Sequence, residues 1–181
     1  GGGGDGPVGH TDAVMCLAWN PITPNVLASG SADHTVMLWD LSGECGGSVA
    51  TFRHHEDKVQ AVGWHPTEAP ILLSAGFDRR AVVIDVRAPE QAAREWALSA
   101  DAEKVCWCPG GDAFVVSSED GVVACFDAKA SGGGKRLWQL KAHAAAASAL
   151  DFCPGQPDLL ATGGQDKLIK LWKLGGGTEE P

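Results

Sequence analysis

A serine, a histidine and an aspartate, which together can do acid–base chemistry, recur along this chain at fixed spacing. The first set is His10, Ser29 and Asp33, with the aspartate 23 positions after the histidine. This combination occurs in nucleophilic hydrolases, where Ser29 would attack the substrate and His10 would act as the base. Two further sets keep the order and the spacing: His55, Ser74 and Asp78, then His143, Thr162 and Asp166.

Repetition favours a structural contact over catalysis. A catalytic nucleophile is seldom repeated along one chain, the last set has Thr162 in place of serine, and no G-x-S-x-G motif is present. Trp39 and Trp172 each follow their aspartate by six positions. We therefore expect a buried relay in which the indole N–H donates to the Ser or Thr oxygen, the hydroxyl donates to one imidazole nitrogen, and the other imidazole N–H donates to the carboxylate. Breaking the relay would strand a buried polar group at a cost of about 1–3 kcal/mol.

The elements that would hold these residues are short strands. Val26–Asp40 reads as strand, turn and strand, with strands at Val26–Ser29 and Thr35–Trp39 around a turn at Gly30–His34. Each unit also has a first strand, which contains Trp19 or its counterpart and ends at a proline. The hairpin recurs at Ile71–Val86, Ala113–Asp127 and Leu159–Lys173, and outer strands are expected at Val49–Arg53, Arg94–Ser99 and Arg136–Lys141.

This pattern predicts an all-β fold. His10 to His55 is a period of 45 residues, typical of a propeller blade. Strands that are apolar on both faces need cover on both sides, which radially stacked blades provide. We expect a partial β-propeller of four blades, each a four-stranded antiparallel sheet, the last without its outer strand. The predicted boundaries are 1–8 (flexible, glycine-rich), 9–53, 54–99, 100–141 and 142–174 (blades), and 175–181 (flexible tail).

The units are not equivalent. Leu98 occupies the histidine position of the third unit, so that unit is degenerate and its blade should depend on packing. Only the first and fourth units have the tryptophan that a full relay needs. The chain begins with Gly1 rather than methionine, and we expect it to be a fragment of a longer gene product.

Gly9-His10, Asp33 and Trp39-Asp40 together resemble a WD repeat, and residues 9–174 resemble a run of four such repeats. The resemblance implies a parent propeller of about seven blades, a non-catalytic role in protein interaction, and no cofactor. The terminal dipeptide departs from the family pattern in the later units, where it is Ile84-Asp85, Phe126-Asp127 and Trp172-Lys173.

Several segments are similar to one eukaryotic branch of this family, which is associated with the nucleus, the nucleolus, ribosomal RNA processing and chromatin. The resemblance implies a scaffold in ribosome biogenesis, with ribosomal-precursor or chromatin complexes as partners. It implies a nuclear and nucleolar location, with the cytoplasm left open. The segments are GHTDAV (9–14), NVLASGSADHTVMLWD (25–40), DKVQ (57–60), HPTEA (65–69) and DVRAP (85–89).

A surface for a protein or peptide partner is expected where the turns between second and third strands meet one face of the propeller. Phe77 is the large aromatic residue at that position, and Arg79 and Arg80 follow it. An aromatic residue beside arginine is typical of an interface anchor, although burial of Phe77 against the neighbouring blade is at least as open an alternative. Glu56, Asp57 and Lys58 of the adjoining loop would form a polar rim.

A second functional class is a substrate receptor of a cullin-type ubiquitin ligase. Leu72-Leu73-Ser74-Ala75 followed by Ile84-Asp85-Val86-Arg87 resembles the box that such adaptors use, with Asp85 and Arg87 as contact residues. Ile84 stands where an aromatic residue is usual. A hydrolase that uses Ser29, His10 and Asp33 is the third class.

Composition narrows the partners. The net charge of −9 argues against direct binding to nucleic acid by bulk electrostatics, and no apolar run reaches membrane-spanning length.

Six cysteines without a C-x-x-C pair favour a reducing compartment and no metal site. The sequence Gly132-Gly133-Gly134-Lys135 lacks the rest of a phosphate loop, and Glu119-Asp120-Gly121 has too few oxygen ligands for calcium.

Overall fold

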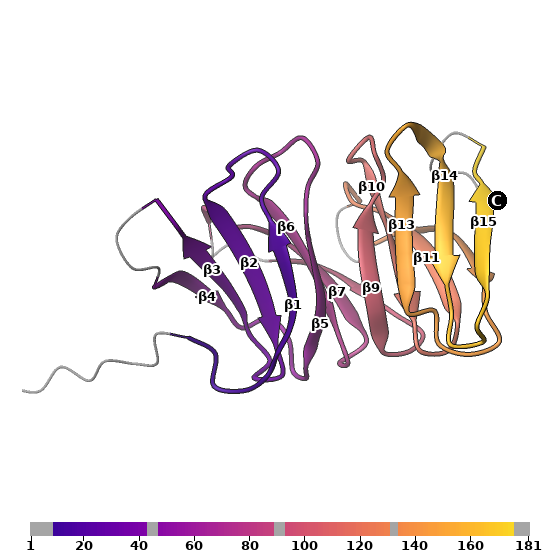
Figure 1. The fold of residues 1–181 in the computed structure, drawn as a ribbon. Coiled ribbons are helices and arrows are strands. Elements are labelled where there is room, and N and C mark those ends of the chain that lie inside the picture. Colours follow the sequence, from indigo (N-terminus) through magenta and orange to yellow (C-terminus); the bar gives the residue numbers. More distant parts are fainter. Residues whose placement is uncertain (1–8, 43–46, 89–92, 131–133, 176–181) are drawn as a thin grey trace, which may run out of the picture.

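The computed structural model describes residues 9–42, 47–88, 93–130 and 134–175, and all of its regular elements are β-strands. They form four antiparallel sheets in chain order (Figure 1). We call these sheets blades 1 to 4. Within the described ranges blade 4 has three strands and the others have four, so the predicted fold class is confirmed. The strands of blades 1 and 2 are β1 (Val14–Trp19), β2 (Val26–Ser31), β3 (Val36–Asp40), β4 (Ser48–Phe52), β5 (Val59–Trp64), β6 (Ile71–Gly76), β7 (Arg80–Asp85) and β8 (Arg94–Ala97). Those of blades 3 and 4 are β9 (Ala102–Trp107), β10 (Ala113–Ser118), β11 (Val122–Asp127), β12 (Arg136–Lys141), β13 (Ala149–Cys153), β14 (Gln156–Gly163) and β15 (Ile169–Lys173).

The turn of the blade 1 hairpin is shorter than the sequence predicts. Strand β2 continues to Ser31 rather than ending at Ser29, and β3 begins at Val36 rather than at Thr35. The Thr35 hydroxyl and N–H both donate to Asp33 Oδ1, at 2.6 and 3.0 Å, which keeps Thr35 in the turn. The expected flexible ends, 1–8 and most of 175–181, lie outside the described residues.

The blades stack through their first strands and their faces. Strand β1 contacts β5, β5 contacts β9, and β9 contacts β13, so the four first strands follow one another across the molecule (Figure 1). A hydrophobic cluster fills each of the three spaces between neighbouring blades. In the middle space the ring of Phe114 lies 4.9 Å from that of Trp96 and 5.8 Å from that of Trp107, centroid to centroid. The core therefore lies between the blades.

The turn after each blade's aspartate has a left-handed residue. The φ angles are 68° at His34, 59° at Arg79, 70° at Lys167 and 75° at Gly121. A residue with a side chain is strained in this left-handed backbone conformation, whereas glycine, which has no Cβ, is not. At Gly121 glycine is required for a second reason, since a Cβ there would lie 2.3 Å from the carbonyl oxygen of His143. No helix in the described ranges is long and apolar enough to cross a membrane.

Candidate interaction surface

The structure brings the polar set of blade 1 together as a chain of hydrogen bonds. Trp39 Nε1 donates to Ser29 Oγ at 2.8 Å, and Ser29 Oγ lies 2.7 Å from His10 Nε2. His10 Nδ1 lies 3.0 Å from Asp33 Oδ2. Because the carboxylate can only accept, Nδ1 carries the proton and Nε2 accepts from the serine hydroxyl. The relay joins the turn before β1 to the turn between β2 and β3.

Blade 4 repeats this chain in full. Trp172 Nε1 donates to Thr162 Oγ1 at 2.9 Å, which lies 2.9 Å from His143 Nε2. His143 Nδ1 lies 2.9 Å from Asp166 Oδ1.

Blade 2 has the relay without its indole. His55 lies between Ser74 and Asp78, at 2.9 Å from each. Ile84 occupies the tryptophan position, so Ser74 receives no indole N–H.

The carboxylates of the relay are held in the ionised form. Burial by itself would raise the pKa of Asp33, but hydrogen bonds from the Thr35 hydroxyl, the Thr11 N–H and His10 outweigh it and hold that pKa well below its usual value. Burial by itself would likewise raise the pKa of Asp78, but hydrogen bonds from His55 and from the Glu56 and Arg80 N–H groups outweigh it and lower that pKa. Each aspartate therefore stabilises the blade as an anion.

The same atoms have the connectivity of a catalytic triad but no access to a substrate. Ser29 is 1% exposed, and its oxygen already accepts the indole proton. The side chain of His10 is 2% exposed. A nucleophilic serine must be reached by the carbonyl carbon of its substrate, and the buried Ser29 oxygen is not accessible to one. The arrangement fits a structural connection between two turns.

Blade 3 reaches the same shape with other residues. Val116, fully buried, stands in the register position of Ser29, and Phe126 stands in that of Trp39. The counterpart aspartate, Asp120, accepts from the Ser99 hydroxyl at 3.0 Å instead of from a histidine. Packing replaces the inner part of the relay, and a surface hydrogen bond replaces its outer end.

Two polar residues that tie neighbouring blades were missed in the sequence. Asn20 Nδ2 donates to the carbonyl of Ala69 in blade 2 at 2.7 Å, and His65 Nε2 donates to that of Gly111 in blade 3 at 2.9 Å. Each also accepts backbone N–H groups two and three residues further on through its other polar atom. The available signal was a polar residue between the recurrent tryptophan and proline, in Trp19-Asn20-Pro21 and Trp64-His65-Pro66.

The residues proposed for partner contact lie where the loop before β5 meets the turn between β6 and β7, and the Phe77 N–H donates to the Lys58 carbonyl there at 2.9 Å. We call this the Phe77 surface: Glu56, Asp57, Lys58, Phe77, Arg79 and Arg80. Phe77 is half-buried, and Lys58 Nζ lies 5.9 Å from the centre of its ring. Arg80 forms ion pairs with Glu56 at 2.9 Å, Asp78 at 3.3 Å and Glu95 at 3.2 Å. Arg79 is exposed and pairs with Asp101 at 3.2 Å. The surface is thus an aromatic side chain within a preformed network of mixed charge.

The residues of the adaptor-like box lie elsewhere on blade 2. Arg87 donates to the Asp85 carboxylate through Nε at 3.0 Å and through Nη2 at 2.7 Å. The guanidinium remains on the surface, with the Arg87 side chain 72% exposed. In the described part of the chain no group of histidine, cysteine and carboxylate side chains is suited to hold a metal.

Comparison with known proteins agrees with this geometry. A family model described as "WD domain, G-beta repeat" matches residues 7–40, 46–85 and 134–173. The chain belongs to the WD-repeat family, and the resemblance inferred from the sequence is confirmed. Two of the matches begin at an outer strand, so each of those repeats starts in one blade and ends in the next.

Relatives with a narrower name match almost the whole chain. Periodic tryptophan protein 1 of Saccharomyces cerevisiae is 37% identical over 170 residues, covering 91% of this chain and 29% of the relative. Its Drosophila melanogaster homolog is 34% identical over 172 residues, covering 93% and 37%. The chain therefore spans about a third of the length of these relatives.

A solved structure shows the same fold. "Crystal Structure of Mitotic Checkpoint Complex" contains a chain that matches with a TM-score of 0.81 and 22% identity, covering 92% of this chain and 50% of that one. At this identity the likeness shows the fold alone.

Proposed function

We propose that this chain is part of a non-catalytic scaffold that holds ribosomal-precursor complexes together in the nucleolus during ribosomal RNA processing. The observation that carries the proposal is the 37% identity to a periodic tryptophan protein 1 along 91% of the chain. The association with ribosomal RNA processing and chromatin comes from the resemblance of the sequence segments described above. A rigid set of blades suits this role, because turns from different blades reach one face and can each meet a different partner.

The Phe77 surface is the contact site within this proposal. A half-buried aromatic ring can insert into a partner pocket without a large loss of side-chain entropy, and the ion pair of Arg80 with Glu56 ties the polar rim to the turn that carries Phe77. The net charge of −9 favours a protein partner over RNA as the direct contact.

The test is recovery of partners with the full-length parent protein, tagged at its own locus. We expect ribosomal-precursor RNA and assembly proteins to co-purify and the tag to be found in the nucleolus. Phe77→Ala with Arg79→Glu should remove at least one protein partner. The matched control is Ile22→Ala with Arg136→Glu, which changes an exposed apolar and an exposed basic residue outside the Phe77 surface. Recovery of no ribosomal-precursor component with the unchanged protein would overturn the role, and an unchanged partner set with the Phe77 variant would overturn the surface.

A substrate receptor of a cullin-type ubiquitin ligase is the second candidate. The observation that favours it is the exposed guanidinium of Arg87, which Asp85 holds in one orientation through two hydrogen bonds. It borders a hollow of about 360 Å³ whose lining includes Trp64, Pro70 and Val86. Arg87→Asp should abolish recovery of the ligase adaptor and leave ribosomal-precursor recovery unchanged, with Arg136→Asp as the control. Absence of the adaptor from the unchanged protein would dismiss this candidate.

A further inference from the structure

A notch between blades 2 and 3 opens at the ends of the strands that lie away from the Phe77 surface. Phe77 follows the last residue of β6, whereas the notch lies where β6 begins, at Ile71. The volume of the notch is about 130 Å³. Its walls include His65, Glu68 and Arg94 from blade 2, and Trp107 and Lys129 from blade 3.

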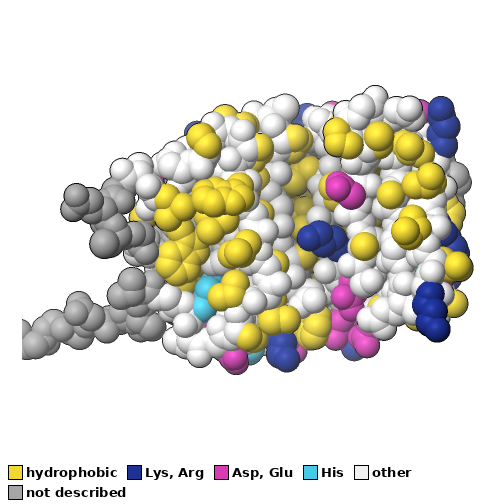
Figure 2. All heavy atoms as spheres, viewed as in Figure 1, with side chains coloured by type: hydrophobic (Ala, Val, Ile, Leu, Met, Phe, Trp, Pro, Cys, Tyr) yellow, Lys and Arg dark blue, Asp and Glu magenta, His cyan; other side chains and the backbone are white. Residues whose placement is uncertain are grey.

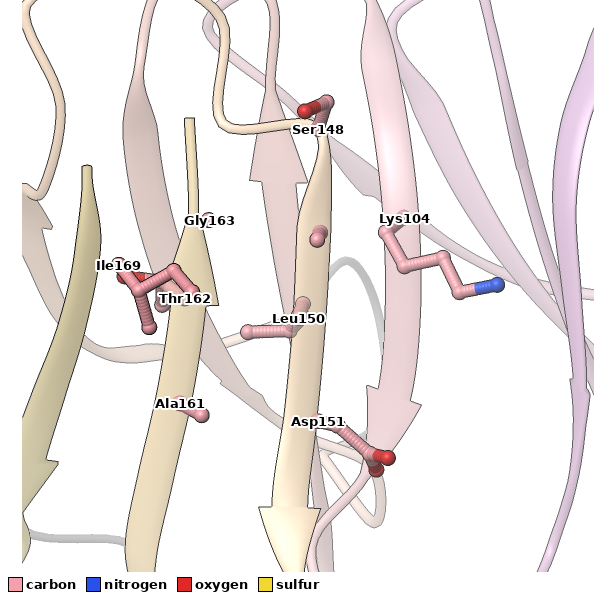
Figure 3. A pocket seen from close by; sticks show the side chains of 9 residues that line it. Lys104, Ser148, Leu150, Asp151, Ala161, Thr162, Gly163 and Ile169 are labelled. Carbon is pink, nitrogen blue, oxygen red and sulfur yellow. The ribbon is translucent and has the colours of Figure 1, made fainter. Parts of the chain in front are cut away.

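The notch is formed by blades that have neighbours on both sides in the described chain. Blade 2 contacts blade 1 through β5 and β1, and blade 3 contacts blade 4 through β9 and β13. A larger hollow of about 440 Å³, with Lys104 on one side and Ile169 on the other, differs in this respect (Figure 3). It lies on the face of blade 4 against which no described blade packs, so this chain does not define what covers it.

His65 and Gly111 preform a neutral floor. The ring of His65 lies 4.5 Å from that of Trp107, centroid to centroid, and its Nε2 donates to the Gly111 carbonyl at 2.9 Å. Its Nδ1 accepts the Glu68 N–H at 3.0 Å, so that nitrogen carries no proton and the imidazole is uncharged. Gly111 has a φ of 77°, and a Cβ there would lie 2.3 Å from His65 Cε1. The close approach of the imidazole therefore requires glycine at this position.

Arg94 supplies a half-buried positive charge that has no carboxylate partner in the described ranges. It begins β8, and its Nη1 donates to the Ala128 carbonyl of blade 3. Arg79, Arg80 and Arg87 of the same blade each pair with a carboxylate instead. A guanidinium has five N–H donors, and the bond to Ala128 leaves the edge with Nε and Nη2 for a further acceptor. A carboxylate at this edge would accept from these donors and neutralise the charge.

The rim of the notch admits one negative charge better than several. Lys129 is exposed there and pairs with Asp112, and Glu68 is exposed with its Oε1 3.8 Å from His65 Nε2. The lining thus has two cations, Arg94 and Lys129, and one acid. A single carboxylate can reach both cations, whereas a group with two or more negative charges meets more repulsion from Glu68 and Asp112.

The charge of Arg94 distinguishes this notch from the other spaces between blades. Arg94 pairs with Val83 in the sheet of blade 2. In the same register blade 1 has Ala50 and blade 3 has Trp138, both without charge. The repeat therefore does not need a cation at this position to form its sheet, which favours a role in binding.

We infer that the notch binds a single glutamate or aspartate side chain of a partner protein. The carboxylate accepts two hydrogen bonds from Arg94 and faces Lys129, and its carbon chain packs against Ile71 and Trp107. These apolar walls favour a carboxylate on a carbon chain over inorganic phosphate.

A protein partner suits this site better than nucleic acid does. Over the described part of the face in Figure 2, acidic and basic side chains are interspersed, with no continuous basic area for a phosphate backbone. The net charge of −9 acts in the same direction. The site is independent of the proposed ribosomal role, and it lets the chain hold a second partner while the Phe77 surface holds the first.

The test uses the full-length parent protein, isotope-labelled at its tryptophan indoles for magnetic resonance. The probe is the peptide acetyl-Ala-Glu-Ala-amide, and acetyl-Ala-Gln-Ala-amide is its uncharged control. We expect the acidic peptide to shift the Trp107 signal saturably, with a dissociation constant on the order of 1 mM. The control peptide should leave the signal unchanged. A Trp107→Phe variant assigns the signal.

Charge changes at the notch distinguish binding from a purely structural role. Arg94→Gln should raise the dissociation constant at least about tenfold, because it removes the two-bond contact. Glu68→Gln should lower it about threefold, since it removes the repulsive acid, and Lys129→Gln should raise it about threefold. Arg53→Gln, exposed and outside the notch, is the matched control and should not change it.

Thermal unfolding checks that each variant is folded. If Arg94→Gln loses the fold, the opposite shifts of Glu68→Gln and Lys129→Gln at exposed sites decide the question. The inference is overturned if the acidic peptide gives no saturable shift, or if the glutamine peptide binds equally well. Equal affinity in all the notch variants overturns it too. Inorganic phosphate that binds as tightly as the acidic peptide would show a simple anion site, which also contradicts it.

Discussion

Blades 3 and 4 are neighbours with the same strand order, yet they are held together in different ways. Blade 4 is closed by His143, which is 1% exposed and sits between Thr162 and Asp166. Blade 3 has no histidine there, and every residue of its strand β10 is buried. Blade 3 has neighbours on both faces, whereas blade 4 has one on a single face in the described structure. Blade 2 also has neighbours on both faces and keeps its relay, so the number of covered faces does not decide where a relay is found. The comparison instead shows that apolar packing can take the place of the relay within one blade.

The largest loss is expected from Phe114→Ala in blade 3. Phe114 is fully buried and contacts the rings of Trp96, Trp107 and Phe126, so truncation leaves a cavity between two blades. The free energy of unfolding should fall by about 3–5 kcal/mol in chemical denaturation. Val49→Ala, at a site that is 63% exposed, is the control and should change it by less than about 0.5 kcal/mol. A loss below about 1 kcal/mol from Phe114→Ala would show that blade 3 is not held by packing.

The next largest loss is expected from His143→Ala in blade 4. The substitution leaves Thr162 and Asp166 without their shared partner, and we expect a loss of about 2–4 kcal/mol in unfolding free energy. Leu98→Ala at the corresponding position of blade 3 should cost less, because no buried polar atom loses a partner there. A double-mutant cycle of His143→Ala with Asp166→Ala should show strongly non-additive losses. Simple additivity would mean that the two residues do not act as a unit.

A gain is expected from Ser117→Ala in blade 3. Ser117 is fully buried, and its hydroxyl has no partner in the described structure. Ala75 fills the corresponding register position of blade 2, next to Ser74 as Ser117 is next to Val116. Removing the unsatisfied oxygen should raise the unfolding free energy by about 1 kcal/mol. Ser74→Ala in blade 2 is the contrasting variant and should lower it, since that hydroxyl is bonded to His55.

The smallest expected effect is on the pH dependence of the unfolding free energy in acid. Folding lowers the pKa values of Asp33, Asp78 and Asp166. Between these lowered values and the ordinary aspartate pKa, the unfolded chain therefore binds more protons than the folded one. The stability that these groups contribute is present above about pH 4, near the ordinary aspartate pKa, and is lost as pH falls through the lower folded values. Asp78→Asn should flatten the fall of unfolding free energy between pH 5 and pH 2, by an amount that solvent screening keeps small. An unchanged slope would mean that Asp78 has the same pKa in both states.

Much of the fold could be predicted because its determinants are local. Alternating β-branched and aromatic residues around turns such as Ala32-Asp33-His34 define the hairpins, and the period of 45 residues defines the blades. The pairing of histidine with aspartate was also open to prediction, since only a recurring contact explains their constant spacing. The contacts of Asn20 and His65 were not, because their acceptors belong to loops of the next blade.

The position of Phe77 was left open for the same reason. Whether its ring is buried depends on Lys58 and on the neighbouring blade, and the structure leaves it half-buried. The network of Arg80 could not be predicted either. Glu56 and Glu95 approach it from a loop and from another strand, and only the folded sheet brings these three together.

The sequence by itself determined the strands, the turns and the partners within each blade, because short-range pattern and hydrogen-bonding chemistry decide them. Only the tertiary structure decided which of the equivalent positions in the repeats are buried. Trp19 and Trp64 occupy the same place in the same pattern, but one is 58% exposed and the other 7%. The physical reason is that the burial of a sheet face depends on the blade stacked against it, which the pattern within one repeat does not contain.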